Sequence, residues 1–376
     1  MDFNRYFKSR QGDLLNALKT IVALESPTSD KAAVDACAAL VVREFAKIGA
    51  GHTRYGQDDI GDLHLFEYPP GASKKADERI LVLLHVDTVW PVGKIGKMPF
   101  YVSGGKAFGP GALDMKAGIV MCLHALQALR QLNIAPRKRI AVVLNSAEET
   151  GHDAATALIL DQARKSSLAL CLEPAIPGGA LKTERKGRMV VRLEARGKAA
   201  HAGAPSKGVS AIEELIVQLG RLKKIRTGET TANIGLVGGG DKPNIVAETA
   251  WAEIDVRFWK AVDRDRVRAY FRGLEPSLGG AKIKASFESL TPPLERSRGS
   301  SALFARAGEI AAGLGITLES GKTGGGSDGS LAASVGLPTL DGLGPDGDGI
   351  HAEHEHVLLP SLIARTALLT ELLARL

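Results

Sequence analysis

Acidic and imidazole side chains of this sequence stand where apolar runs end and loops begin. Such oxygen and nitrogen ligands hold divalent metals in hydrolases, together with a hydrolytic water. The residues concerned are His85, Asp87, Asp114, Glu148, Glu149, Glu173 and His351. Their placement predicts a site for two metal ions.

The tripeptide His85-Val86-Asp87 directly follows the apolar run 80–84. His85 can bind a metal through one ring nitrogen while Asp87 accepts the proton of the other, which fixes the tautomer. A histidine that only hydrogen-bonds at a strand end explains the tripeptide equally well. Asp114 closes a glycine-rich loop, where a carboxylate can bridge two metals or cap the helix that follows.

Glu148 and Glu149 are the sharpest local signal. Two adjacent carboxylates after an apolar strand repel each other, and a bound metal offsets that cost. One of them can bind the metal while the other takes a proton from the attacking water. The alternative is a solvated acidic pair at a helix start, which the preceding apolar run disfavours.

Two further ligand positions are weaker when taken singly. Glu173 ends the apolar run 168–172 and can supply another carboxylate. Near the C-terminus His351, His354 and His356 compete for one position, and a histidine-rich surface loop is the alternative.

The region after residue 184 offers His201, Asn244 and Arg257. His201 lies in an expected loop between a strand and a helix, where it can donate to a developing oxyanion. Arg257 ends an expected strand and can grip a carboxylate through two hydrogen bonds. Considered alone, His201 is more often a surface residue and Arg257 an ion-pair partner.

Apolar runs alternate with helical patterns in the first half of the chain. Strands are expected at 63–66, 80–84, 140–144 and 168–172, and helices at 1–26, 30–48, 116–132 and 153–165. Continuous apolar runs are typical of strands that are buried on both faces. The alternation predicts an α/β fold with a mostly parallel sheet, whose carboxyl edge carries the ligands.

The pattern changes near residue 184. We expect strands at 189–194, 231–237, 246–258 and 281–288. Helices are expected at 209–223, between the first two strands, and at 263–273, between the last two. This β-α-β-β-α-β order is ferredoxin-like. Helices at 300–313 and from about 359 then resume the first pattern. The sequence therefore predicts a catalytic domain of residues 1–183 and 292–376, interrupted by a smaller domain of residues 184–291.

Composition argues against several classes of protein. The 376 residues are enough for two domains. The net charge of +6 comes from scattered Lys and Arg without interleaved aromatic residues, which favours small anionic substrates over nucleic acid. The three cysteines stand in apolar stretches and are expected to be reduced. No signal-peptide pattern and no uninterrupted apolar stretch of membrane-spanning length is seen, so a cytoplasmic protein without a membrane partner is expected.

The ordered set of motifs resembles the M20 metallopeptidase family, and within it the glutamate carboxypeptidase (carboxypeptidase G2-like) branch. The motifs are HVDTVWPVG, GPGALDMKAG, NSAEETG, CLEP, GKAAHAGAP, PNIVAETAWAEIDVRF, GGGSDG and GIHAEHEHV. The resemblance covers nearly the whole chain, and the order of the pieces is more specific than any one of them.

The resemblance implies two Zn²⁺ per subunit, with Co²⁺ or Mn²⁺ as substitutes. His85 and Glu173 would bind one ion, Glu149 and His351 would bind the other, and Asp114 would bridge the two. His351 is preferred over its neighbours because of its spacing from the following glutamate and valine.

The resemblance also assigns roles around the metals. Asp87 would orient the histidine that precedes it, and Glu148 would be the general base. Residues 184–291 would form a lid and dimerisation domain, whose His201 reaches the partner subunit's site to stabilise the tetrahedral intermediate.

Substrate contacts follow from the same resemblance. Asn244 and Arg257 would contact the carboxylate end of the substrate, and the Gly326 region would line the pocket. Glutamate-cleaving relatives carry an arginine shortly before the position of Pro292, whereas this chain has Ser289-Leu290-Thr291 there.

These expectations combine into a zinc-dependent hydrolase, homodimeric through residues 184–291. It would cleave the amide bond of a C-terminal amino acid, as a glutamate-type carboxypeptidase does, in small peptides or N-acyl amino acids. An N-acyl or N-carbamoyl amino-acid amidohydrolase, similar to an aminoacylase or an acetylornithine deacetylase, uses the same metal chemistry and stays open. A non-catalytic metal-binding homologue is disfavoured because every ligand and Glu148 are present.

Overall fold

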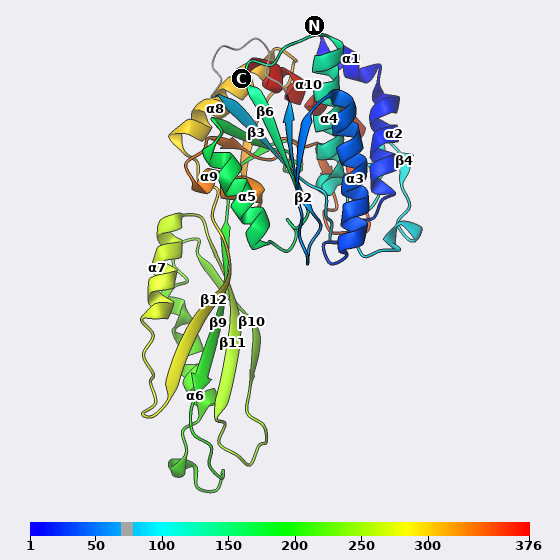
Figure 1. Cartoon of the computed structure of the whole chain (residues 1–376). Helices are drawn as coiled ribbons and strands as arrows, with labels where there is room; N and C mark the ends of the chain where they lie inside the picture. The colour runs from blue at the N-terminus through cyan, green and yellow to red at the C-terminus, as the bar shows by residue number, and fades with distance from the viewer. Residues whose placement is uncertain (69–77) are drawn as a thin grey trace. The chain divides into compact units, whose positions relative to one another are not determined.

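The computed structural model describes residues 1–68 and 78–376, and their internal contacts divide the chain into two units (Figure 1). The first unit consists of Met1–Thr183, Arg296–Lys322 and Ser327–Leu376. The second consists of Glu184–Glu295 and Thr323–Gly326. The second unit thus starts at the expected residue, runs four residues past the expected 291, and takes in part of the glycine-rich turn.

A six-stranded sheet forms the centre of the first unit. In sheet order its strands are β1 (Gly51–Tyr55), β2 (Leu63–Tyr68), β6 (Arg139–Asn145), β3 (Arg79–His85), β7 (Leu168–Cys171) and β14 (Thr339–Leu340). The strands from β6 to β14 pair in parallel, while β1 with β2 and β2 with β6 are antiparallel. The predicted α/β fold with a mostly parallel sheet is confirmed.

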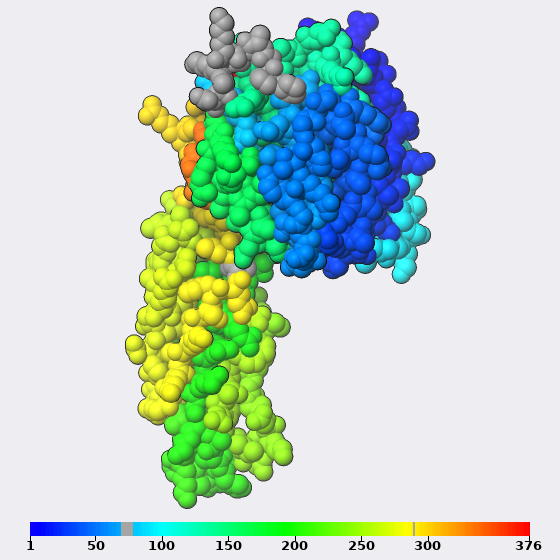
Figure 2. Space-filling view, in the orientation of Figure 1, coloured from blue at the N-terminus to red at the C-terminus, as the bar shows by residue number. Residues whose placement is uncertain are grey.

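Both faces of this sheet are covered by helices, and β3 shows why its sequence is continuously apolar. Ile80, Val82 and Leu84 belong to one hydrophobic cluster, whereas Leu81 and Leu83 belong to the other. Because successive strand residues point to opposite faces, both sets must be apolar. The first cluster includes α2 (Gln11–Val22), α3 (Lys31–Ile48), α4 (Ala117–Gln131), α8 (Arg298–Ala312) and α10 (Leu359–Arg375), and the second includes α5 (Asp153–Arg164) and α9 (Asp328–Ser334). In Figure 2 the blue surface of α2 and α3 forms an outer face of this unit.

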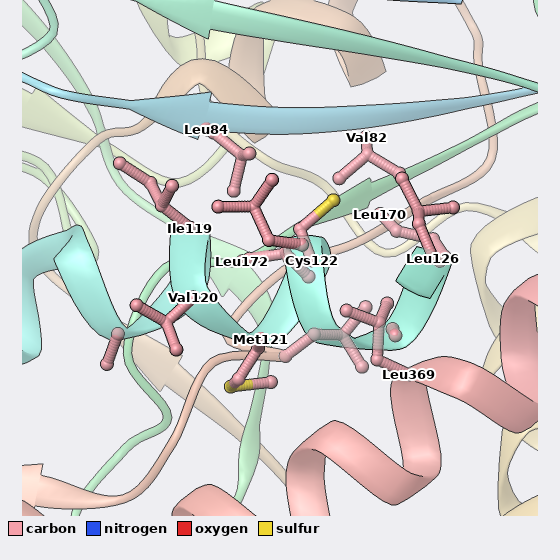
Figure 3. Close-up of a cluster of buried hydrophobic side chains, with 14 of the residues drawn as sticks. Val82, Leu84, Ile119, Val120, Met121, Cys122, Leu126, Leu170, Leu172 and Leu369 are labelled. Atoms are coloured by element: carbon pink, nitrogen blue, oxygen red, sulfur yellow. The ribbon is translucent and has the colours of Figure 1, made fainter. Parts of the chain in front are cut away.

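Helix α4 is the central helix of the first cluster. Figure 3 shows Ile119, Cys122 and Leu126 packed against side chains that include Val82 and Leu84 of β3. With the turn before it, the segment Ala112–Gln131 is 20 residues long and has a mean hydropathy of 1.3, which is enough to cross a membrane. Asp114, Lys116 and Arg130 interrupt this segment, so it is not an uninterrupted apolar stretch. Moreover, 89% of this apolar window is buried inside the protein, as in the core helix of a globular domain.

The expected N-terminal helix over 1–26 is interrupted. Helix α1 (Phe3–Lys8) ends at Ser9, whose hydroxyl donates to the Tyr6 carbonyl at 2.8 Å, and α2 starts at Gln11. Such a side-chain bond to the backbone competes with continuation of the helix. The next helix follows its sequence signals: the Asp30 side chain accepts the N–H of Ala33, and Gly49 closes α3 at a φ of 83°.

The second unit has the expected β-α-β-β-α-β order. Its elements are β9 (Gly187–Arg196), α6 (Ala211–Gly220), β10 (Thr231–Gly239), β11 (Thr249–Phe258), α7 (Ala261–Arg272) and β12 (Lys282–Thr291). The strands form an antiparallel sheet in the order β10-β11-β9-β12. Met189, Val191 and Leu193 alternate with more exposed residues along β9 and lie in the core of this unit. The ferredoxin-like expectation is confirmed.

Several short strands had no sequence signal. They are β4 (Tyr101–Ser103), β5 (Lys106–Phe108), β8 (Leu181–Arg185), β13 (Ser320–Thr323), β15 (Gly347–Asp348) and β16 (His356–Leu358). β15, β16, β5 and β4 form one small sheet, which ties the segment after His351 to the segment before Asp114. The three cysteines are free and buried, as expected.

Candidate metal centre

Three parallel strands of the central sheet end at one edge, and the candidate ligands follow them. His85 is the last residue of β3 and lies opposite Asn145, the last residue of β6. Glu148 follows β6 by three residues, and Glu173 follows the end of β7 by two. The carboxyl ends of parallel strands are where open α/β sheets form their sites.

The first group of side chains surrounds His85. Its Nε2 atom lies 3.2 Å from Asp114 Oδ1 and 3.3 Å from Glu173 Oε1. Glu148 joins this group: His85, Glu148 and Glu173 each offer one ligand atom, and these atoms lie within 4.8 Å of one another.

The second group surrounds His351. Its Nε2 atom lies 3.4 Å from Asp114 Oδ2 and 3.3 Å from Glu149 Oε2. The ligand atoms of these three residues also lie within 4.8 Å of one another. The two oxygens of the Asp114 carboxylate therefore face two different groups.

These distances suit a cation between the atoms. Ligands about 2.1 Å from a tetrahedral zinc ion are separated by about 3.4 Å, close to the spacings around His85 and His351. The donor set of imidazole nitrogens and carboxylate oxygens is that of hydrolytic zinc sites. Residues of both groups thus fit two divalent ions that share Asp114.

The protonation of the cluster supports this fit. Burial opposes a charge on His85, but Asp114, Asp87 and Glu173 outweigh it and raise its pKa well above the ordinary value. Hydrogen bonds with Asp114 and Glu149 raise the pKa of His351 to about 10. Burial opposes ionisation of Asp114, yet both histidines hold its pKa well below its usual range. The carboxylates of the cluster thus favour positive charge between them. Divalent cations can supply that charge in place of the protons on the two histidines.

Asp87 is positioned differently from the expectation. The Nδ1–H of His85 donates to the backbone carbonyl of Asp87 at 3.0 Å, whereas the nearest carboxylate oxygen lies at 3.5 Å. Either acceptor leaves Nε2 for a ligand role. The carboxylate instead accepts the N–H groups of Glu148 and Glu149 at 3.1 and 3.2 Å and the hydroxyl of Thr28 at 2.7 Å. Asp87 therefore connects the β3 end to the acidic pair.

The acidic pair stands at a corner, so adjacent side chains enter both groups. Burial, followed by the charge of Glu173, raises the pKa of Glu148 well above its ordinary value. Burial also raises the pKa of Glu149, against the hydrogen bond with His351. This arrangement differs from a solvated pair, in which both carboxylates would face water.

Asp114 does not cap the following helix. Helix α4 begins at Ala117, and its N-cap Lys116 makes no side-chain cap hydrogen bond. The loop is held instead by Glu355, which sequence reasoning used only as a spacing marker. This buried carboxylate accepts the N–H groups of Gly111, Leu113 and Asp114 at 2.8 to 3.1 Å. It thereby fixes the backbone that carries the Asp114 carboxylate.

His351 is distinguished from the other two histidines by position and backbone. His354 is exposed, and His356 donates from Nδ1 to the His354 carbonyl at 2.8 Å within its own loop. His351 adopts a φ of 60°, a value that non-glycine residues rarely take and that clusters at functional sites. Only His351 of the three belongs to a metal-ligand group among the described residues.

Two other residues of the cluster were missed from the sequence. Lys182 is buried and its Nζ lies 3.8 Å from Glu173 Oε2. Asp328, at the start of α9, accepts a hydrogen bond from Asn145 at 2.9 Å. Burial raises the pKa of Asp328 to about 7, against that hydrogen bond. Asp328 lies 183 positions from Asn145, and the GGGSDG motif indicated its segment but not the role of this carboxylate. Lys182 stands in a stretch without a motif.

The remaining candidates all lie in the second unit and fall into two places within it. His201 and Asn244 are neighbours. Ile245 forms an isolated antiparallel β-bridge with His201, and the N–H of Ala202 donates to the Asn244 carbonyl. Arg257 stands at the other end of β11, about 25 Å away by the rise of a strand. A small substrate therefore cannot contact Asn244 and Arg257 of the same subunit together.

Arg257 is partly engaged already. It donates to both carboxylate oxygens of Asp255 at 2.7 and 3.2 Å and to the Gly324 carbonyl at 3.3 Å. The ion-pair role is thus real, and the side chain remains partly exposed. Gly326 lies in the same turn, where its carbonyl accepts a hydrogen bond from Arg185 at 2.8 Å.

Comparison with known proteins identifies relatives along the whole chain. Residues 81–375 match the family model of peptidase family M20/M25/M40. The chain is 29% identical to carboxypeptidase G2 of Pseudomonas sp. (strain RS-16), over 94% of this chain and 87% of that protein. It is 25% identical to the succinyl-diaminopimelate desuccinylase of Thioalkalivibrio sulfidiphilus, over 97% of this chain and 99% of that protein.

Solved structures show the same fold. Aminopeptidase PepT from Bacillus cereus matches with a TM-score of 0.77 at 23% identity, over 97% of this chain and 98% of that chain. The YxeP protein of Bacillus subtilis, described as a dinuclear metal binding peptidase from the M20 family, matches with a TM-score of 0.71 at 15% identity, over 98% of each chain.

Proposed function

This chain belongs to peptidase family M20/M25/M40, and on that premise we propose that it is a zinc-dependent hydrolase that removes a C-terminal amino acid. Its substrates are small peptides or N-acyl amino acids, and a glutamate-type carboxypeptidase is the first specificity to test. The relative carboxypeptidase G2 supports this choice. The single observation that carries the proposal is the Asp114 carboxylate, whose two oxygens face two separate ligand groups.

The proposed ligands follow this geometry. His85 and Glu173 hold one ion, Glu149 and His351 hold the other, and Asp114 bridges them. When bound, two such ions lower the pKa of a water to about 7 and polarise the substrate carbonyl.

Glu148 is the proposed general base. Its carboxylate belongs to the first group but is not needed as a metal ligand, because His85, Glu173 and Asp114 already converge there. Its raised pKa lets it accept the proton of the attacking water and hold it until the amine leaves. Proton delivery to the departing nitrogen returns Glu148 to its starting state.

Residues of the second unit are proposed to bind the substrate and stabilise its developing charge. Arg257 would anchor the substrate carboxylate, with Gly326 lining the pocket. His201 would donate to the oxyanion in the partner's site, with Asn244 beside it. The separation of the two places along β11 supports this division, since one small substrate cannot span both ends of the strand.

A homodimer through residues 184–291 is part of the proposal. β10 is an edge strand of its sheet, and Leu236 and Val237 on it are exposed. Ile216 on α6 is 62% exposed. Exposed edges and apolar side chains of this kind favour association with another chain. A dimer that survives Ile216→Glu but not Val262→Glu, an equally exposed position on α7, would contradict this choice of surface.

Amino-acid release from a substrate panel tests the function. The zinc-loaded protein is incubated with acyl-glutamates such as folate, acyl-aspartates, acetylornithine, N-acetyl apolar amino acids and dipeptides, with and without a chelator. Chelator-sensitive release of glutamate is the expected result. Release of another amino acid would keep the mechanism and change the specificity, and no release from any substrate would contradict the hydrolase proposal.

A second candidate is an N-acyl or N-carbamoyl amino-acid amidohydrolase. The similarity to succinyl-diaminopimelate desuccinylases favours it, as does the absence of a basic side chain in Ser289-Leu290-Thr291. Faster hydrolysis of acetylornithine or succinylated amino acids than of acyl-glutamates would select this candidate over the carboxypeptidase.

A further inference from the structure

A cavity of about 480 Å³ lies among α1, α2, α3 and α4 of the first unit. This is within the size range of sites that enclose small organic molecules. The residues of the metal centre do not line it. Among the residues that do line it is His124 on α4. His124 lies seven residues after Ala117, so it is about 10 Å along the helix from the end that follows the Asp114 loop. The cavity is therefore separate from the catalytic cluster.

The inner wall of the cavity is apolar. Phe7, Ile21, Val41 and Val120 line it and are buried. Tyr6 adds an aromatic side wall, with its ring edge-on to Phe7 at a centroid separation of 5.0 Å. An aromatic or aliphatic body can therefore be removed from water in this space.

An imidazole also lines this cavity. His124 is half-buried between fully buried neighbours on α4, and its ring has no hydrogen-bond partner among the described residues. Burial lowers its pKa, against the charges of Asp13 and Glu44, so the ring is neutral at pH 7. A neutral imidazole can accept a hydrogen bond from a ligand.

Charged side chains at the cavity favour a cation. Arg10, Asp13 and Glu44 are the charged residues that line it, which gives a net charge of −1. The Asp13 carboxylate has no hydrogen-bond or ion-pair partner in the described part of the chain. Glu44 accepts a hydrogen bond from the exposed Lys47 through Oε1 at 2.7 Å, so its Oε2 atom can still accept one from a ligand. The guanidinium of Arg10 lies over the Tyr6 ring at 3.9 Å.

We propose that this cavity binds a small organic cation with an apolar body, such as an arylalkylammonium ion. The ammonium pairs with Asp13 and Glu44 and donates to the His124 ring, while the body packs on the apolar wall. An anionic ligand would face two carboxylates, and a bare metal ion would leave the apolar wall unused.

Titration with three probes that share a phenylethyl body tests the charge preference. 2-Phenylethylamine, 2-phenylethanol and 3-phenylpropanoate are titrated into the full-length protein by calorimetry. The amine is expected to bind at least about tenfold more tightly than the alcohol, and the propanoate more weakly than both. The same dissociation constant is expected before and after chelator treatment, because the cavity lies outside the metal centre. Equal binding of amine and alcohol would overturn the proposal.

Isosteric variants locate the site. Asp13→Asn and Glu44→Gln should each weaken binding of the amine about tenfold, since each removes one charge and keeps the shape. Glu371→Gln, an acidic residue of the same unit that pairs with Arg375, is the control and should leave the constant unchanged.

The ring signal of His124, assigned through His124→Gln in histidine-labelled protein, should shift on addition of the amine. Unchanged binding to the Asp13→Asn/Glu44→Gln double variant, or a silent His124 signal, would place the amine elsewhere and overturn the proposal. These readouts do not depend on hydrolysis, so they fail independently of the proposed enzymatic function.

Discussion

The candidate metal ligands of the first unit and the candidate substrate residues of the second unit are held very differently. His85 and Asp114 are 1% and 9% exposed, and each contacts side chains from distant parts of the chain. His201 is exposed, and its ring accepts only from the N–H of Gly203, two residues away, among the described residues. His85 and Asp114 are therefore firmly positioned, whereas His201 has few restraints.

This difference separates two tasks of a hydrolase. Metal ligands and a general base must be placed before the substrate arrives, since misplacement by about 1 Å is costly in rate. Residues that bind substrate can be ordered by the substrate or by a second subunit, with the ordering cost taken from binding. On the proposed function, the first unit carries the chemistry and the second binds the substrate.

The largest effect is expected from Glu148→Ala, which leaves the restraints of the first unit intact but removes the base. Turnover should fall about 10³-fold, while two metals per subunit are retained, because the ligand pairs do not depend on Glu148. Turnover is measured by product release in timed, quenched assays, and metal content by elemental analysis of the same sample. Glu353→Ala, at an exposed residue that pairs with Lys94, is the control. Substantial activity in Glu148→Ala would remove the base assignment.

Metal content distinguishes His351, which contacts two carboxylates, from its neighbour His354, which lies outside the ligand groups. His351→Ala should lose about one metal ion per subunit and nearly all activity, since His351 contacts both Asp114 and Glu149. His354→Ala is the matched control, in the same loop and outside the ligand groups, and should retain both ions. Loss of metal from His354→Ala alone would exchange the two roles.

Mixed dimers test whether the poorly restrained His201 acts across subunits. Glu148→Ala and His201→Ala proteins are each expected to be nearly inactive. After random exchange, half of the dimers would carry one complete site, which gives about a quarter of the wild-type rate. Absence of recovery in dimers confirmed by mass spectrometry would place His201 in its own subunit's site or outside catalysis.

The strands that end at the candidate metal centre were predictable because a strand buried on both faces must be apolar at nearly every position. β3, β6 and β7 are continuous apolar runs, and polar residues begin where each strand emerges. The alternating sequence patterns of β10 and β11 indicated the second unit in the same way. Local periodicity thus determined both the fold and the ends at which ligands appear.

Contacts that join distant segments were not predictable in this way. Glu355 supports the Asp114 loop from more than 240 positions away, and its own neighbourhood reads as a histidine-rich loop. The carboxylate of Asp87 was expected on its neighbour His85, but it binds the backbone of the acidic pair. Strands of two or three residues, such as β15, are too short to show a period.

Arg257→Lys tests the recognition role of the second unit. Lysine keeps the charge but loses the paired donors, so KM should rise about tenfold while kcat stays within about twofold. Arg188→Lys is the control, because Arg188 binds the same Asp255 at 2.7 Å and has no proposed substrate contact. A fall in kcat without a change in KM would move Arg257 from substrate binding to the chemical step.

The smallest effect concerns the frame behind the acidic pair. Ser146 donates its hydroxyl to the carbonyls of Gly61 and Asp62, and the Asp62 carboxylate binds Lys31, Arg54 and the N–H of Gln57. Burial alone would raise the pKa of Asp62, but these partners lower it to about 2. Asp62→Asn should therefore cost about 2 kcal/mol of unfolding free energy at pH 7.

Because the folded-state pKa of Asp62 lies below its ordinary value of 3.8, its stabilisation is complete above about pH 4 and is lost as the pH falls toward 2. Denaturant unfolding of wild type and Asp62→Asn across this range should therefore show curves that converge in acid. Asp58→Asn, in the same loop and exposed, is the control and should follow the wild type at every pH. A stability difference that persists at pH 2 would mean that Asp62 acts through its shape and not its charge, and that the rigidity of the first unit does not rest on this carboxylate.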